Sequence, residues 1–118
     1  MKPLSLAALI AIAAIGGAVH AQSNLRFLED APIQKMTKED LALLEKNYSE
    51  ALDRNADGHT SAWSNPKTGA SGTATPLNTF TLRGMKCRET EFTNFAGGFR
   101  GGGKHAMCRS GGAWKLAS

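Results

Sequence analysis

The chain contains two cysteines, Cys87 and Cys108, whose side chains could take part in several kinds of chemistry. A cysteine can ligate a metal, attack a substrate or form a disulfide. Both cysteines follow an apparent export signal, and an even number of cysteines in a small exported domain indicates disulfide bonding. The sequence therefore predicts a Cys87–Cys108 disulfide. This bridge concerns the stability and the compartment of the protein and leaves its activity open.

The run Asp53-Arg54-Asn55-Ala56-Asp57-Gly58 has the residue order that begins a calcium loop. Asp53, Asn55 and Asp57 would supply the oxygen ligands, and the glycine would allow the sharp turn. The twelfth position should be a bidentate glutamate, but it is Ser64. A polar helix end followed by a turn accounts for the same residues. A small periplasmic calcium-binding or inhibitory protein is therefore the alternative function, while no cofactor is expected.

The sequence predicts no enzyme, because no complete catalytic set is evident. His59 and His105 are the histidines that follow the export signal, and no serine lies in a Gly-x-Ser-x-Gly elbow. Glu89 and Glu91 would face the same side of a strand and could act as a carboxylate pair, although solvated strands carry such pairs too. The glycine-rich run 97–103 lacks the Lys-Ser/Thr ending of a phosphate-binding loop. An enzyme would require a deep pocket that holds Glu89, Glu91 or His105.

Charge is distributed unevenly along the chain. Residues 25–58 carry a net charge of −3, whereas residues 59–118 carry +6. The basic half could contact an anionic envelope component or an envelope protein. Because its basic residues are scattered along several segments, the charge pattern alone favours a solvated basic strand face. Few aromatic residues alternate with the basic ones, so no nucleic acid is expected. The candidate binding residues are the cations Arg83, Lys86, Arg88, Arg100, Lys104 and Arg109.

Residues 1–21 have the pattern of a secretory signal peptide. Lys2 precedes an apolar run at residues 4–15, and Val19-His20-Ala21 places small or modest residues before a break at Gln22. The alternative, a membrane anchor, would need about 20 apolar residues, and this run is shorter. No cysteine lies near the break, so no lipid anchor is expected. Because cleavage would remove the apolar run, no membrane span is expected in the mature protein. The protein is expected to be periplasmic or secreted, with its oligomeric state open.

One helix is expected in the mature chain. Residues 22–36 should form an extended lead-in, with Leu25, Phe27, Leu28 and Ile33 available to pack against the domain at 37–118. Thr37 and Asp40 have the spacing of a capping box. The helical period of the apolar residues that follow, at 41, 44, 48, 51 and 52, predicts an amphipathic helix over residues 38–53.

Short strands separated by turn residues are expected after this helix. Because no segment is long enough for a parallel crossover, the strands should form an antiparallel meander. The expected fold is α+β, with one amphipathic helix packed on about five or six strands and one disulfide. Adjacent strand residues face opposite sides, so Arg88 and Arg109 should share a basic face away from the sulfurs. The expected strands are one centred on Trp63 and those at 72–75, 79–83, 86–94, 104–109 and 113–117, with a long glycine loop at 97–103.

Several peptides of this chain are familiar in combination. They are Asp57-Gly58, the stretch from Trp63 to Pro76, Cys87-Arg88-Glu89, Cys108-Arg109 and Gly112-Ala113-Trp114. Together they resemble the C-terminal domain of the rickettsial-type 17 kDa surface antigen family over about residues 37–116. The resemblance implies an exported, non-enzymatic envelope protein with a structural or binding role. Members often carry a lipidated cysteine and a glycine-zipper segment, and because this chain has neither, we expect a soluble periplasmic form.

Overall fold

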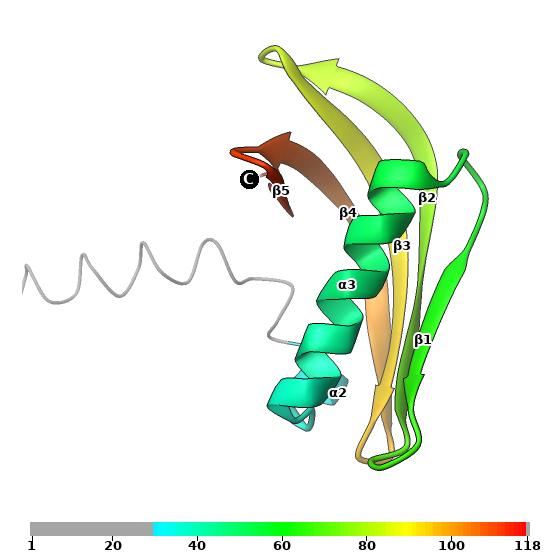
Figure 1. Ribbon diagram of the computed structural model, residues 1–118. Helices are drawn as coiled ribbons and strands as arrows, with labels where there is room; N and C mark the ends of the chain where they lie inside the picture. The colour runs from blue at the N-terminus through cyan, green and yellow to red at the C-terminus, as the bar shows by residue number, and fades with distance from the viewer. Residues whose placement is uncertain (1–29, 118) are drawn as a thin grey trace, which may run out of the picture.

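The computed structural model describes residues 30–117. The predicted signal peptide at 1–21 and the side chains of Leu25, Phe27 and Leu28 lie outside the described residues. The fold is α+β, with a long helix against a single five-stranded antiparallel sheet of order β1-β2-β3-β4-β5 (Figure 1). The elements are α2 (Ala31–Gln34), α3 (Lys38–Arg54), β1 (Ser61–Asn65), β2 (Ala70–Leu82), β3 (Met85–Ala96), β4 (Phe99–Ser110) and β5 (Ala113–Leu116).

Helix α3 begins where the capping box predicts. The Asp40 backbone N–H donates to Thr37 Oγ1 at 3.1 Å, and the Thr37 N–H donates to Asp40 Oδ2 at 3.0 Å. These two bonds satisfy backbone donors that the first helical turn leaves free. The predicted apolar face is confirmed, since Leu44, Tyr48 and Leu52 are buried. The helix ends at Arg54, one residue later than expected.

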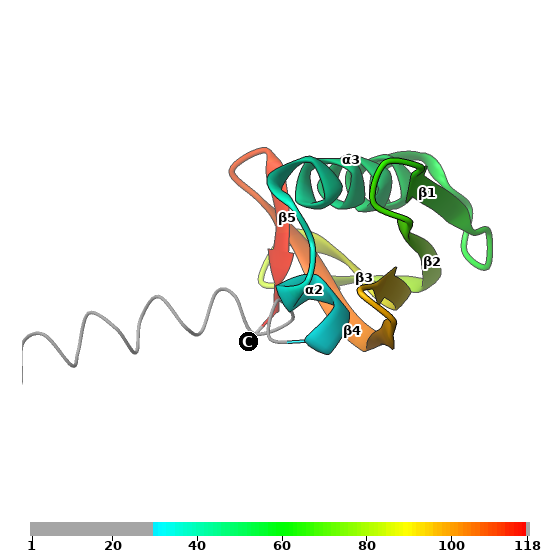
Figure 2. The ribbon, with the colours of Figure 1, turned by 90° about the horizontal axis from the view of Figure 1, so that it is seen from below.

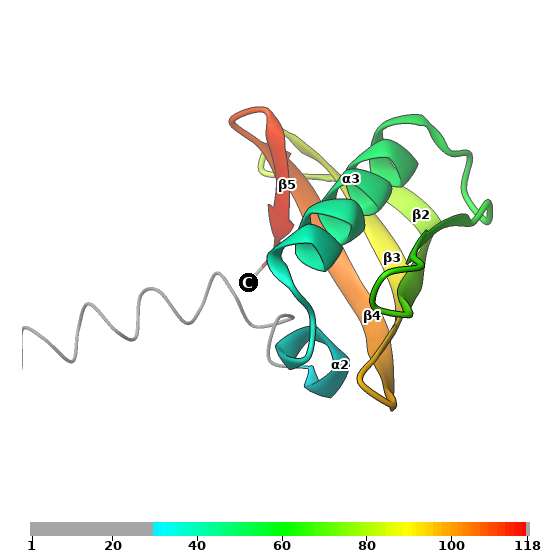
Figure 3. The same cartoon turned by 60° about the horizontal axis from the view of Figure 1, so that its bottom comes forward.

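The sheet curls, and α3 lies across its inner face (Figures 2 and 3). Tyr48 meets Phe92 of β3 edge to face, with ring centroids 6.0 Å apart. Met107 of β4 and Trp114 of β5 extend this core along the sheet. The opposite face of the sheet, called the outer face below, carries no helix in the described part of the chain (Figure 2).

The lead-in differs from its expected extended form. Residues Ala31–Gln34 form the short helix α2, in which Pro32 and Ile33 are buried. Proline is well tolerated in the first turn of a helix because that N–H has no intrahelical acceptor. Ile33 packs into the core as expected. Among residues 30–117 no helix is long and apolar enough to cross a membrane.

Strand β2 runs through Pro76, where two separate strands were expected. The register with β3 shifts between Pro76 and Asn78, which indicates a bulge. The Pro76 carbonyl oxygen accepts from the Gly58 N–H at 2.6 Å, so the polar side of this residue faces away from β3. The missing N–H therefore removes no bond from the β2–β3 ladder. This continuity gives five strands rather than six.

The glycine-rich segment also differs from the long loop expected at residues 97–103. Gly97 and Gly98 alone form the turn, with φ of 58° and 80°, and β4 begins at Phe99. Gly102 lies within the strand at a φ of 130°, and a Cβ there would overlap the Phe92 carbonyl oxygen. Gly102 thus allows close backbone approach between β3 and β4.

Candidate binding surface

The predicted disulfide is present. Cys87 of β3 and Cys108 of β4 are directly opposite each other, with an S–S distance of 2.06 Å and a Cα–Cα distance of 4.0 Å. The bridge lies near the end of the β3–β4 pair that is remote from the Gly97-Gly98 turn. Both cysteines point to the outer face, where Phe80 of β2 is the cross-strand neighbour of Cys87. The disulfide therefore fixes strand pairing and contributes no reactive thiol.

Arg88 points the other way, toward α3, and only 4% of it is exposed. Its Nη1 donates to the Leu52 carbonyl oxygen at 2.9 Å, and its Nη2 donates to Asp57 Oδ1 at 2.7 Å. A cation is favourable here because the last carbonyls of a helix carry partial negative charge. The hydrogen bonds from Arg88 and from the Thr79 hydroxyl hold the pKa of Asp57 below its usual value. Arg88 thus anchors the helix end and is not available to a partner.

Arg109 makes a parallel contact with the same helix. Its Nη1 donates to Asp53 Oδ1 at 2.7 Å, and Trp114 Nε1 donates to the same oxygen at 2.8 Å. Arg88 and Arg109 therefore lie on one sheet face opposite the sulfurs, as strand alternation predicts. That face, however, is the inner face, which α3 covers. We call Arg88, Arg109, Asp53 and Asp57 the arginine clamp.

The calcium-loop residues do not converge on one point. Asp53 and Asp57 accept hydrogen bonds from different arginines of the clamp. Asn55 Nδ2 donates to the His59 carbonyl oxygen and to Ser61 Oγ, so its amide braces the turn into β1. In the described part of the chain, no group of three His, Cys, Asp or Glu side chains is placed to hold a metal. The geometry gives no support to calcium binding.

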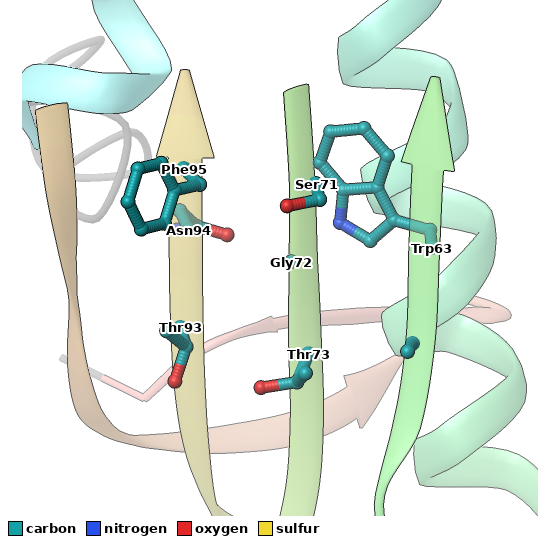
Figure 4. Close-up of a pocket in the computed structure, with 8 residues that line it drawn as sticks. Trp63, Ser71, Gly72, Thr73, Thr93, Asn94 and Phe95 are labelled. Carbon is teal, nitrogen blue, oxygen red and sulfur yellow. The ribbon is translucent and has the colours of Figure 1, made fainter. Parts of the chain in front are cut away.

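The candidate acid–base residues lie on different faces. Glu89 and Glu91 occupy outward positions on β3, and Asn78 Nδ2 donates to Glu89 Oε1 at 3.0 Å. His105 faces inward, with its ring 5.9 Å from that of Phe92. A hollow of about 220 Å³ over β1, β2 and β3 contains none of them. Its lining, which includes Trp63, Gly72, Asn94 and Phe95 (Figure 4), has no titratable side chain.

The four remaining predicted cations are exposed and form two groups. Arg83 and Lys86 lie at the β2–β3 turn, whereas Arg100 and Lys104 lie on β4, whose start adjoins the far end of β3. Ten residues of β3 separate Arg83 from Arg100, which is roughly 30 Å of strand. Within residues 30–117, none of the four has a carboxylate oxygen within the 4.0 Å of an ion pair. These four side chains are the open cationic surface of the sheet.

One buried polar centre was not anticipated from the sequence. Asp40, only 1% exposed, accepts hydrogen bonds from Asn65 Nδ2 at 2.8 Å and Thr68 Oγ1 at 2.7 Å. Burial raises the pKa of Asp40, but the bonds from Thr37, Thr68 and Asn65 outweigh burial and hold it below 3.8. The network fastens the β1–β2 turn to the start of α3. Capping-box spacing identified Asp40, but nothing in the local sequence identifies its long-range partners.

Comparison with known proteins adds one finding. A family model described as 17 kDa outer membrane surface antigen matches residues 50–115. No curated protein and no solved structure matched the chain. The matched segment runs from the last turn of α3 to β5, and it includes both cysteines and the whole arginine clamp.

Proposed function

The chain belongs to the 17 kDa outer membrane surface antigen family, and on that premise we propose that it binds an anionic envelope component through the exposed cations of its sheet. Family membership indicates an envelope-associated protein. The binding role, the mature form that begins at Gln22 and the periplasmic or secreted location are parts of the proposal. The disulfide is compatible with them, because such bonds persist in oxidising compartments.

The observation that carries the proposal is the open cationic surface. Arg83, Lys86, Arg100 and Lys104 are exposed without an ion-pair partner among residues 30–117. By contrast, Arg88 and Arg109 form ion pairs with Asp57 and Asp53 within the clamp. Unpaired surface cations favour association with polyanions such as lipid phosphates, and salt weakens this association.

The proposed role is non-enzymatic. The carboxylates on β3 and the imidazole of His105 face opposite sides of the sheet. A general acid–base pair needs both groups within reach of one substrate. The hollow at Gly72 offers no titratable side chain that could replace them.

Binding of the exported, disulfide-bonded protein to isolated envelope fractions tests the proposal. Lipopolysaccharide, peptidoglycan sacculi and vesicles with anionic phospholipid would each be sedimented with the protein at low and at high salt. We expect at least one fraction to retain the protein at low salt and to release it at high salt. Retention that salt leaves unchanged, or no retention by any fraction, would contradict the proposal.

A further inference from the structure

The end of the β2–β3 hairpin extends beyond the rest of the sheet. Strand β1 pairs with β2 only from Ala70 to Ala74, and β4 pairs with β3 only from Cys87 onward. Figure 1 shows this hairpin rising past the end of α3. The last residues of β2 and the first of β3 therefore have no neighbouring strand other than each other within the described residues.

Large apolar side chains are exposed on this projection. Phe80 is 37% exposed and Leu82 is 38% exposed. They lie two positions apart on β2, so both point to the outer face. Their cross-strand neighbours are Cys87 and Met85, respectively. Phe80, Leu82 and half-buried Met85 form an apolar surface that we call the tip patch.

The charged residues within the hairpin end, residues 79–88, are all positive. Arg83 lies at the turn itself and Lys86 one residue beyond Met85, and residues 79–88 contain no Asp or Glu. Asp57, the carboxylate that approaches this region, is already bonded to Arg88. Exposed apolar side chains with one cation at the adjoining turn and another on the opposite face of the hairpin match the bilayer interface, in which hydrocarbon lies beneath phosphate groups.

The shape of the tip also favours a membrane over a protein partner. A stable protein interface buries roughly 800 Å² on each partner. A tip of two paired strands is narrow and presents few side chains for such contact. A bilayer, by contrast, closes around a small apolar projection, while cations that flank it bind the headgroups.

We infer that the tip patch inserts into an anionic phospholipid bilayer, with Arg83 and Lys86 bound to the lipid phosphates. The inference rests on the proposed function and specifies anionic phospholipid as the envelope component that the protein binds. It also assigns the two cation groups different roles, since Arg100 and Lys104 lie on β4 opposite Phe95 and Glu91, outside the inserted end.

Vesicle binding by two matched variants tests the apolar part. The Phe80→Ser/Leu82→Ser protein should lose roughly tenfold or more in its partition to phosphatidylglycerol-containing vesicles. Phe95→Ser is the control, because Phe95 is 44% exposed and also faces outward, but lies at the other end of β3. The control should bind like the native protein. Equal binding by the double variant would overturn insertion, and near-UV circular dichroism would establish that each variant is folded.

A fluorescence measurement tests insertion without weakening the tip. With brominated acyl chains in the vesicles, Phe80→Trp should show emission quenched beyond that of the native Trp63 and Trp114, whereas Phe95→Trp should not.

Charge variants test the cationic part. Arg83→Gln/Lys86→Gln should reduce vesicle binding more than Arg100→Gln/Lys104→Gln, which removes the same charge. Equal effects of the two charge variants would contradict the inference, and so would equal binding of the native protein to anionic and to phosphatidylcholine vesicles. Neither result would contradict the proposed salt-sensitive binding to other envelope fractions. A concentration-dependent dimer that Phe80→Ser/Leu82→Ser abolishes would assign the patch to a second copy of the chain instead.

Discussion

At the scale of single residues, Arg88 has the clearest physical role. Its guanidinium lies in the interior, yet it donates to a helix carbonyl, to the Thr79 hydroxyl and to the Asp57 carboxylate. A buried cation is tolerated when its donors are satisfied in this way. Its sequence neighbourhood, a basic strand, predicts a solvated side chain, because it does not reveal which strand face the helix covers.

Replacing Arg88 should therefore destabilise the fold. Arg88→Met keeps much of the side-chain volume but removes the donors, and we expect the free energy of unfolding to fall by about 2–4 kcal/mol. Urea denaturation measures the change. Lys86→Met, an exposed substitution on the same strand, should lie within about 0.5 kcal/mol of the native protein. A similar small effect for Arg88→Met would refute the anchoring role.

Tyr48 provides a prediction about pH, and it is the one tyrosine of the chain. Burial and the nearby Glu45 charge raise the pKa of Tyr48 to about 12 from its ordinary 10.0. Because the unfolded phenol ionises first, folding stability is intact below pH 10.0 and falls as the pH rises toward 12. Phenolate absorbance should titrate near 12 in native protein and near 10.0 in urea. A native midpoint at the urea value would show that the ring is solvated.

At the scale of elements, the β2–β3 turn contains a local conflict. Arg83 has a φ of 51° and Gly84 a φ of 77°, so both turn residues are left-handed. Such two-residue turns favour Asn-Gly, whereas other L-residues are strained there. Arg83→Asn should raise the free energy of unfolding by about 0.5–1 kcal/mol. Gly84→Ala should lower the free energy of unfolding. Thermal unfolding of both variants measures these changes, and an Arg83→Asn protein that is no more stable than the native protein would contradict the prediction.

The disulfide stabilises the β3–β4 pair through the unfolded chain. Cys87 and Cys108 are separated by 21 residues, and loop-closure entropy for such a length corresponds to about 3 kcal/mol. Cys87→Ala/Cys108→Ala should lose about that much stability in urea denaturation. The native protein should show no free thiol before reduction. Two titratable thiols in the exported protein would contradict the bridge.

The elements differ in how far the sequence predicts them. Helix α3 follows from a capping box and a helical period, and both are local signals. Pro76 and the run Gly101–Gly103 lie inside strands although each is locally a breaker. Their tolerance depends on strand neighbours: β3 does not need the Pro76 N–H, and the Phe92 backbone requires glycine at 102. Such neighbours are known only after the register is known.

At the scale of the whole molecule, ion pairs within the fold neutralise part of the charge asymmetry of the chain. The acidic segment contains α3 and the basic segment contains the sheet, and Arg88, Arg109 and Lys67 each form an ion pair with the acidic segment. The sequence therefore predicts the sign of the sheet surface but overstates its free charge. Four of the six candidate cations remain exposed without an ion pair among residues 30–117. Two of them lie at the β2–β3 turn and two on β4.

The most direct test of an anionic envelope partner compares charge variants on native membranes. The Arg83→Gln/Lys86→Gln/Arg100→Gln/Lys104→Gln protein removes the open cationic surface and leaves the arginine clamp intact. We predict that its association with isolated outer membranes at low salt falls roughly tenfold or more and no longer depends on salt. An association as strong and as salt-sensitive as that of the native protein would show that these cations do not bind the envelope.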